Sequence, residues 1–185
     1  MRDDFAVMII THGRPDNQLT LNCLHKIGYT GKLFLVVDDE DSTKDEYIRL
    51  YGDSVLLFHK DEWFDIGDNF YDQKNSSVYA RNECFIIAKS LGLRYFLEMD
   101  DDFTEIMLRY DDGNKLRKST IRSADDLFEA FCEYLETDGI TCLSFATEGD
   151  GIGGRDGVFK KRITRKARNS FFCSVEKPFE FFGRF

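Results

Sequence analysis

Short apolar runs that alternate with amphipathic stretches constrain the fold of this 185-residue chain more than any other feature of its sequence. The runs with the length and composition of buried β-strands are Phe5–Ile10, Lys32–Val37, Ser54–Phe58 and Tyr95–Met99. A helical pattern lies between most successive runs, and repeated strand–helix units pack as a mostly parallel sheet with right-handed crossovers. We therefore predict an α/β fold with helices on both faces of the sheet, in a single domain over residues 1–185.

Capping residues and glycines mark the ends of the predicted helices. Asp16 is the predicted cap of the first helix, and Ser42 begins a capping-box pattern before the second. The third helix covers Val78–Leu91 and is followed by a glycine, and Ser123 caps the fourth. Two further strands are predicted, in Ile140–Ala146 and in Phe171–Phe185.

The composition excludes several classes of protein. A formal net charge of −9 argues against a sequence-independent nucleic-acid coat protein, whose contacts to phosphate need a basic surface, although a local basic patch remains compatible with it. The five cysteines lack CxxC spacing, so we predict reduced, buried thiols and neither a disulfide framework nor a zinc site. The sequence shows no signal peptide and no apolar run of about 18 residues, so we expect a soluble, cytoplasmic protein without a membrane partner.

Polar clusters follow three of the predicted strands directly. They are Thr11–Arg14, Asp38–Asp41 and Asp100–Asp102. In open α/β sheets, ligands bind outside the carboxyl ends of the parallel strands, where such clusters meet. We therefore expect these clusters to surround one ligand.

The acidic triplet Asp100–Asp102 is the sharpest of these signals. On an extended segment Asp100 and Asp102 project to the same side, so both carboxylates can face one hard cation. An Mg²⁺ or Mn²⁺ ion held by few carboxylates keeps open positions for diphosphate oxygens and can stabilise a leaving diphosphate. A run of aspartates is more often a solvated turn, but the apolar strand before this one places it at the binding edge of the sheet. We predict that Asp100 and Asp102 are metal ligands.

Two side chains at the start of the helix before that strand suit a nucleotide. Arg81 can donate a pair of hydrogen bonds to phosphate or to a base edge, and Asn82 offers both a donor and an acceptor. The alternative is that both side chains are exposed to water in the first helical turn.

Together these motifs resemble the core of GT-A glycosyltransferases of the family-2 type. In that class an Ala-Arg-Asn helix precedes a strand that ends in a metal-binding DxD motif, as residues 80–82 precede 100–102 here. The opening Thr-x-x-Arg-Pro at 11–15 is similar to the first nucleotide loop of the class. The resemblance implies a metal-dependent enzyme whose donor is a nucleotide-diphosphate sugar, with a UDP-sugar as the first expectation. It implies donor contacts from Thr11, Arg14, Asp38, Asp39, Arg81, Asn82 and Asp100.

Within this class the chain is similar to the phage TET-associated glycosyltransferases, which add sugar to 5-hydroxymethylpyrimidines in DNA. This narrower resemblance is carried by the Thr-His-Gly-Arg-Pro opening, the block Lys74–Asp102 and the motif Lys-Pro-Phe-x-Phe-x-Gly-Arg at 177–184. It implies 5-hydroxymethylcytosine in DNA as the acceptor, and the host-cell cytoplasm as the location of a phage-encoded protein.

The remaining expectations concern the acceptor and the catalytic base. A basic stretch at 160–168 is the predicted contact to DNA phosphates, with a solvated loop as the alternative. Its candidate residues are Lys160, Lys161, Arg162, Arg165, Lys166 and Arg168. The resemblance implies an acidic general base shortly after residue 184, where this chain ends, so we expect the base to be missing from it. Asp150 and Asp156, in a glycine-rich stretch, are the candidate substitutes.

Other classes of protein fit parts of the pattern. A nucleotidyltransferase shares this type of fold but needs a glycine-rich phosphate loop after its first strand, where this chain has a single glycine. A haloacid-dehalogenase-like phosphatase places its paired aspartates after the first strand, where this chain has Thr-His-Gly. A truncated, non-catalytic nucleotide-sugar-binding domain stays open as an alternative, and so does a transferase acting on a glycan or a small molecule.

Overall fold

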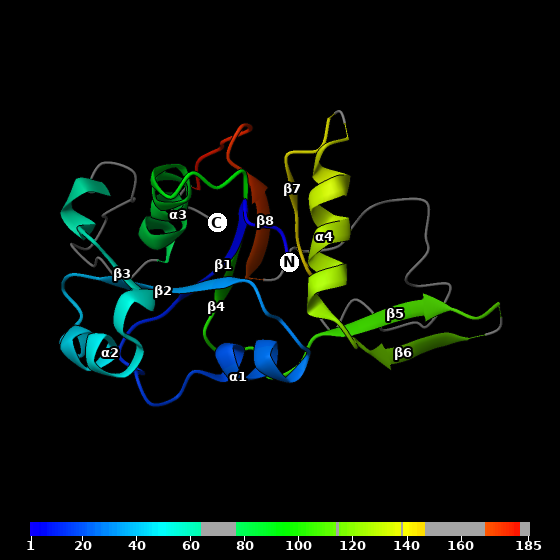
Figure 1. Cartoon of the computed structure of the whole chain (residues 1–185), viewed down its shortest axis with the longest axis horizontal. Coiled ribbons are helices and arrows are strands. Elements are labelled where there is room, and N and C mark those ends of the chain that lie inside the picture. The colour runs from blue at the N-terminus through cyan, green and yellow to red at the C-terminus, as the bar shows by residue number, and fades with distance from the viewer. Residues whose placement is uncertain (64–76, 114, 138, 147–168, 182–185) are drawn as a thin grey trace, which may run out of the picture.

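A six-stranded sheet organises the part of the chain that the computed structural model describes, residues 1–63, 77–113, 115–137, 139–146 and 169–181. Its strands are β1 (Phe5–Ile10), β2 (Lys32–Asp38), β3 (Val55–Phe58), β4 (Tyr95–Asp100), β7 (Cys142–Leu143) and β8 (Ser170–Ser174). They lie in the order β3-β2-β1-β4-β8-β7 (Figure 1). Strands β1 to β4 are parallel to one another, and β8 runs antiparallel to both of its neighbours.

Helices cover both faces of this sheet. They are α1 (Leu19–Lys26), α2 (Lys44–Tyr51), α3 (Val78–Ser90) and α4 (Ala124–Leu135), with short 3-10 turns η1 (Gly52–Ser54) and η2 (Lys60–Trp63). Along β1, Phe5 and Val7 pack with α1, α2 and α4, whereas Ala6 and Met8 pack with α3, because successive strand residues point to opposite faces. Figure 1 shows α3 and α4 on opposite sides of the central strands. The predicted α/β fold is confirmed.

An aromatic layer fixes β8 against the parallel part of the sheet. Phe5 of β1 stacks on Phe172 of β8 with ring centroids 4.9 Å apart, and Phe128 of α4 lies 5.8 Å from Phe5. All three rings are buried. Burial of a phenylalanine side chain contributes roughly 1.5–3 kcal/mol, so this cluster is a major part of the core.

The strand register brings the carboxyl ends of β1, β2 and β4 to one edge of the sheet. Ile10, the last residue of β1, pairs with Val36 of β2 on one side and with Asp100 of β4 on the other. The polar segments that follow these strands therefore leave the sheet side by side, as the sequence predicted.

The starts of two helices differ from the sequence prediction. α1 begins after Gln18 rather than Asp16, because the Gln18 side chain bonds the loop that follows β1. α2 begins after Thr43 rather than Ser42, because the Thr43 amide and hydroxyl bond the acidic loop before the helix. Ser123 caps α4 as predicted, since its hydroxyl accepts a hydrogen bond from the helix.

A β-hairpin that the sequence prediction missed follows the acidic triplet. It consists of β5 (Met107–Asp111) and β6 (Leu116–Thr120), which pair with each other in a separate two-stranded sheet. Its turn contains Asp-Gly, a strong hairpin signal, and Gly113 has a φ of +90°. The strand predicted over Ile140–Ala146 is shorter than expected, because only Cys142–Leu143 pairs with β8.

Two expectations from composition concern thiols and membranes. All five cysteines are free, and all except Cys142 are buried, as predicted. Within the described ranges, every helix is too short or too polar to span a membrane.

Candidate functional site

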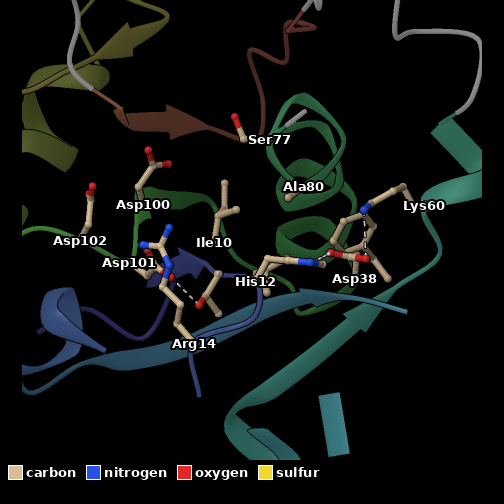
Figure 2. Close-up of a pocket in the computed structure, with 13 residues that line it drawn as sticks. Ile10, His12, Arg14, Asp38, Lys60, Ser77, Ala80, Asp100, Asp101 and Asp102 are labelled. Atoms are coloured by element: carbon tan, nitrogen blue, oxygen red, sulfur yellow. Dashed lines mark hydrogen bonds and ion pairs between the residues drawn. The ribbon is translucent and has the colours of Figure 1, made fainter. Parts of the chain in front are cut away.

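A pocket of about 320 Å³ opens at the carboxyl ends of β1, β2 and β4. This volume lies at the lower end of the range for small-molecule sites. Its apolar lining comes from Ile10, Val36, Phe58 and Ala80. Its polar lining comes from Thr11, His12, Arg14, Asp38, Lys60, Ser77, Asp100, Asp101 and Asp102 (Figure 2). Members of all three predicted polar clusters therefore line one pocket.

The aspartates of the acidic triplet have different surroundings. Figure 2 shows the carboxylates of Asp100 and Asp102 on the same side of the chain, although β4 ends at Asp100 and the next two residues form a turn. The Asp102 side chain is exposed and that of Asp100 is partly exposed. Asp101 is buried and accepts hydrogen bonds from the Thr11 hydroxyl at 2.7 Å and from Arg14 Nη1 at 3.0 Å. Asp101 thus belongs to the packing of the first loop, whereas its two neighbours present carboxylates together.

The loop Thr11–Arg14 is held by buried hydrogen bonds. The Thr11 hydroxyl donates to Asp101, lies 2.7 Å from the Tyr47 hydroxyl and accepts from Gln18 Nε2 at 2.9 Å. Tyr47 accepts from the Arg14 backbone amide and so directs its own proton to Thr11. Because a hydroxyl has one proton and two acceptor sites, these contacts use the full capacity of Thr11. Thr11 lines the pocket, but all the hydrogen bonds of its hydroxyl are made with other residues of the protein.

Asp38 binds two basic side chains of the pocket that the sequence prediction did not single out. Its Oδ2 lies 2.7 Å from His12 Nδ1, and its Oδ1 lies 3.0 Å from Lys60 Nζ. Lys60 is buried, which is tolerable for a cation because Asp38 compensates its charge. His12 is 61% exposed, and its contact through Nδ1 leaves Nε2 on the far side of the ring. The position of Lys60 in the turn after β3 carries no sequence signal.

Asp39 and Asp41 lie beside the pocket and are absent from its lining within the described residues. Asp39 accepts a hydrogen bond from the Lys60 amide, and Asp41 accepts from the amides of Gly13 and Thr43. Burial raises the pKa of each carboxyl, but the hydrogen bonds outweigh it, so the pKa of each is lowered. Both remain anionic at neutral pH, and Asp41 ties the first loop to the second.

Arg81 contacts the first aspartate of the acidic triplet and is not among the residues that line the pocket. Its Nη1 donates to Glu98 at 3.0 Å and its Nη2 to Asp100 at 2.6 Å, while its guanidinium lies 5.1 Å from the Phe171 ring centroid. Burial raises the pKa of Glu98 to about 8, although Arg81 acts in the opposite direction. Burial also raises the pKa of Asp100, and the nearby guanidinium only partly offsets this. Arg81 thus positions the Asp100 carboxylate, and its contact with a phosphate of the donor stays a prediction.

The side chain of Asn82 binds the backbone of Phe181, near the C-terminal end of the chain. Its Nδ2 donates to the Phe181 carbonyl at 3.1 Å, and its Oδ1 accepts from the Phe181 amide at 2.8 Å. Asn82 is buried, so this pair of hydrogen bonds replaces the water it has lost. These hydrogen bonds hold the segment after β8 against α3, and the contact of Asn82 with a nucleotide stays a prediction.

The carboxylates available for a metal are few in the described residues. No group of three or more His, Cys, Asp or Glu side chains is arranged there to hold an ion. Asp100 and Asp102 are the pair that lines the pocket with carboxylates on one side. The candidate bases Asp150 and Asp156, and the basic stretch at 160–168, lie outside the described residues.

Comparison with known proteins identifies the family. No curated protein sequence matches the chain. The family model described as TET-Associated Glycosyltransferase matches residues 5–185, which is nearly the whole sequence and includes every residue of the pocket. The fold agrees with that match, because its mostly parallel sheet is consistent with a GT-A-like glycosyltransferase. The chain therefore belongs to the TET-associated glycosyltransferase family.

Proposed function

We propose that this chain transfers a sugar from a nucleotide-diphosphate sugar to the hydroxyl of 5-hydroxymethylcytosine in DNA, with Mg²⁺ or Mn²⁺ at Asp100 and Asp102. The carrying observation is that these two carboxylates lie on one side of the chain at the edge of a pocket with an apolar lining, in a member of a glycosyltransferase family. Cation, diphosphate and nucleoside would then occupy successive parts of one site.

The charge of the pocket argues for a divalent cation. Three aspartates of the triplet and Asp38 line it, and a diphosphate would add further negative charge. Arg14 and Lys60 are already paired with Asp101 and Asp38. Carboxylate oxygens are the ligands that Mg²⁺ and Mn²⁺ prefer, so Asp100 and Asp102 fit such an ion. When bound, the ion would neutralise the diphosphate and stabilise it as a leaving group.

The protein's own side chains would orient the donor. Arg14 is half-exposed and uses Nη1 on Asp101, so its other N–H groups can donate to phosphate oxygens. His12 is fixed through Nδ1 by Asp38 and can offer Nε2 to a ribose or a base. Phe58 and Val36 offer an apolar surface to the flat base. Asp38 would act through His12 and Lys60, and Arg81 would act by holding Asp100.

The acceptor assignment depends on the family and on charge. TET association suggests DNA modification, and a cytosine that carries a 5-hydroxymethyl group offers the hydroxyl that a glycosyltransferase needs. The basic stretch at 160–168 would contact the phosphates of the acceptor in an otherwise acidic chain. A glycan or small-molecule acceptor would need no such stretch.

A transfer assay with matched acceptors tests this function. The protein would be incubated with Mn²⁺ and a panel of UDP-, GDP- and TDP-hexoses, together with a duplex that contains 5-hydroxymethylcytosine or cytosine. The DNA would be digested to nucleosides, and their masses would be measured by mass spectrometry. We expect a hexose on hydroxymethylcytosine alone, with Asp150 or Asp156 as the candidate base within this sequence, and its loss with EDTA or with Asp102→Asn.

The controls separate the parts of the proposal. Asp53→Asn removes an exposed carboxylate remote from the pocket lining and should leave transfer unchanged. Hexose transfer that survives EDTA would overturn the metal requirement. Transfer to an oligosaccharide or a free sugar, with none to either duplex, would overturn the DNA acceptor. Binding of donor without any transfer would identify a non-catalytic sugar-nucleotide-binding protein.

A further inference from the structure

We propose that the β5–β6 hairpin is a docking element that lies in the major groove of the acceptor duplex. This inference rests on the proposed function, because it takes DNA as the acceptor, and it adds a contact surface made of described residues. The residues that carry it are Leu108, Arg109, Tyr110, Arg117 and Lys118.

The hairpin forms a sheet of its own, and the side chains of Leu108, Tyr110 and Arg117 on one of its faces are exposed. Its strands pair with each other and not with the six-stranded sheet, and Figure 1 shows them extending away beyond α4. Leu108 is 52% exposed and Tyr110 is 45% exposed, and neither belongs to a buried core cluster. An isolated two-stranded hairpin is only marginally stable in water, so a hairpin with bare apolar side chains points to a partner.

The charge of the hairpin selects an anionic partner. Arg109, Lys115, Arg117 and Lys118 lie within residues 107–120, against two aspartates, in a chain whose net charge is −9. Arg117 donates to Asp112 at 2.6 Å, but an ion pair at the surface contributes little and can be exchanged for phosphate. The hairpin thus has local positive charge on a molecule that otherwise repels DNA.

The pairing register divides the hairpin into two faces that suit a groove. Tyr110 lies opposite Arg117, and directly paired residues of an antiparallel ribbon share a face. Leu108 belongs to this same face, whereas Arg109 and Lys118 are paired on the other. One face therefore combines an apolar patch with a cation, and the opposite face carries Arg109 and Lys118 against Asp111.

The dimensions and the position of the hairpin favour a duplex over other anions. The major groove is about 12 Å wide and admits a two-stranded β-ribbon, and apolar side chains there contact groups at the pyrimidine C5 position. The 5-hydroxymethyl group projects into that groove from C5. β5 begins five residues after Asp102, so a ribbon in the groove would lie next to the pocket that holds the donor.

Fluorescence anisotropy with charge-matched variants tests the inference. The hairpin variant is Arg109→Gln, Arg117→Gln and Lys118→Gln. The control variant is Lys26→Gln, Arg49→Gln and Lys89→Gln, which changes the net charge equally at exposed positions of α1, α2 and α3. Each protein would be titrated against a 5-hydroxymethylcytosine duplex at several salt concentrations. Thermal unfolding would check that both variants fold, as the hairpin's position outside the core predicts.

We expect the hairpin variant to bind at least about tenfold more weakly than wild type, with a salt slope smaller by about 1 for each lost phosphate contact. The control variant should bind almost as wild type does. A second pair of variants, Tyr110→Ser and its control Tyr134→Ser, separates contacts in the groove from contacts to phosphate. Because a tyrosine carries no charge, Tyr110→Ser should weaken binding without changing the salt slope. Tyr134→Ser, which changes a somewhat more exposed tyrosine on α4, should have no effect.

The possible failures are distinguishable. If wild type binds the duplex and the hairpin and control variants bind equally well, the hairpin assignment is overturned while the DNA acceptor stands. If wild type binds no duplex, the DNA acceptor itself fails and the hairpin assignment fails with it. If the hairpin variant changes only the sedimentation coefficient of the protein, then the hairpin contacts a second copy of this chain instead.

Discussion

Replacing Asp101 by asparagine should separate the roles of the three consecutive aspartates. Asp101 is buried and accepts from both Thr11 and Arg14, whereas Asp102 is exposed at the pocket edge. An asparagine keeps the shape of the side chain but turns one acceptor into a donor. Because Thr11 already accepts from Tyr47 and Gln18, it cannot also accept from the new amide without losing a partner.

The magnitude follows from the two bonds. A buried hydrogen bond to a charged group is worth about 1.5–3 kcal/mol, which applies to Thr11. The ion pair between Arg14 and Asp101 is half-exposed, so it adds at most about 1 kcal/mol to the free energy of unfolding after screening by solvent. We therefore expect Asp101→Asn to lose about 2–3 kcal/mol, or about 4–12 °C in Tm for a chain of this length.

Thermal and urea unfolding, followed by circular dichroism, would measure this loss. Asp102→Asn is the matched control and should stay within about 0.5 kcal/mol of wild type, because it changes an exposed side chain. The reasoning is refuted if Asp101→Asn unfolds at the wild-type midpoint, or if both variants lose equal stability.

Three further predictions concern groups that support the site. Arg81→Met should cost about 1–3 kcal/mol in urea unfolding because it leaves the buried Glu98 carboxyl without its hydrogen-bond donor, and combining it with Glu98→Met should recover most of that loss. The pKa of Asp41 is lowered from its ordinary value of 3.8, so the ionised carboxylate stabilises the fold above pH 3.8. This stabilisation is lost as the pH falls below that value and the carboxylate is protonated. The free energy of unfolding of Asp41→Asn should therefore depend less on pH below about 4 than that of wild type. Lys177→Met should cost about 1–3 kcal/mol in thermal unfolding, since Lys177 Nζ donates to the carbonyls of Leu135, at the end of α4, and of Ile140. Lys89→Met on the exposed side of α3 should be neutral.

The fold and the edge of the site could be predicted because they depend on local patterns. The apolar run Phe5–Ile10 and the stripe in Val78–Leu91 each match the periodicity of one element. The rule that ligands bind at the carboxyl ends of parallel strands then placed Thr11, Asp38 and Asp100 around one pocket. The sequence predicted an extended triplet, whereas β4 ends at Asp100 and the next two residues form a turn.

The partners of the polar residues could not be predicted from local patterns. Arg81 suited a phosphate equally well, and its contacts to Glu98 and Asp100 depend on how α3 crosses β4. One signal was present: an acidic residue inside the apolar run Tyr95–Met99 needs a cation once it is buried. The β5–β6 hairpin was missed even though its Asp-Gly turn is visible in the sequence, because β6 has a single apolar residue and the alternation of apolar and polar residues is confined to β5.

Calorimetric titration of UDP in the presence and absence of Mn²⁺ tests the central claim, that Asp100 and Asp102 hold the cation that binds the donor diphosphate. Neither carboxylate can fill an octahedral shell, so the diphosphate must complete it and the two ligands should bind cooperatively. We predict that wild type and Asp53→Asn bind UDP tightly only with Mn²⁺, and that Asp102→Asn binds it at least about tenfold more weakly. Equal affinity of Asp102→Asn and wild type for UDP with Mn²⁺ would contradict the account.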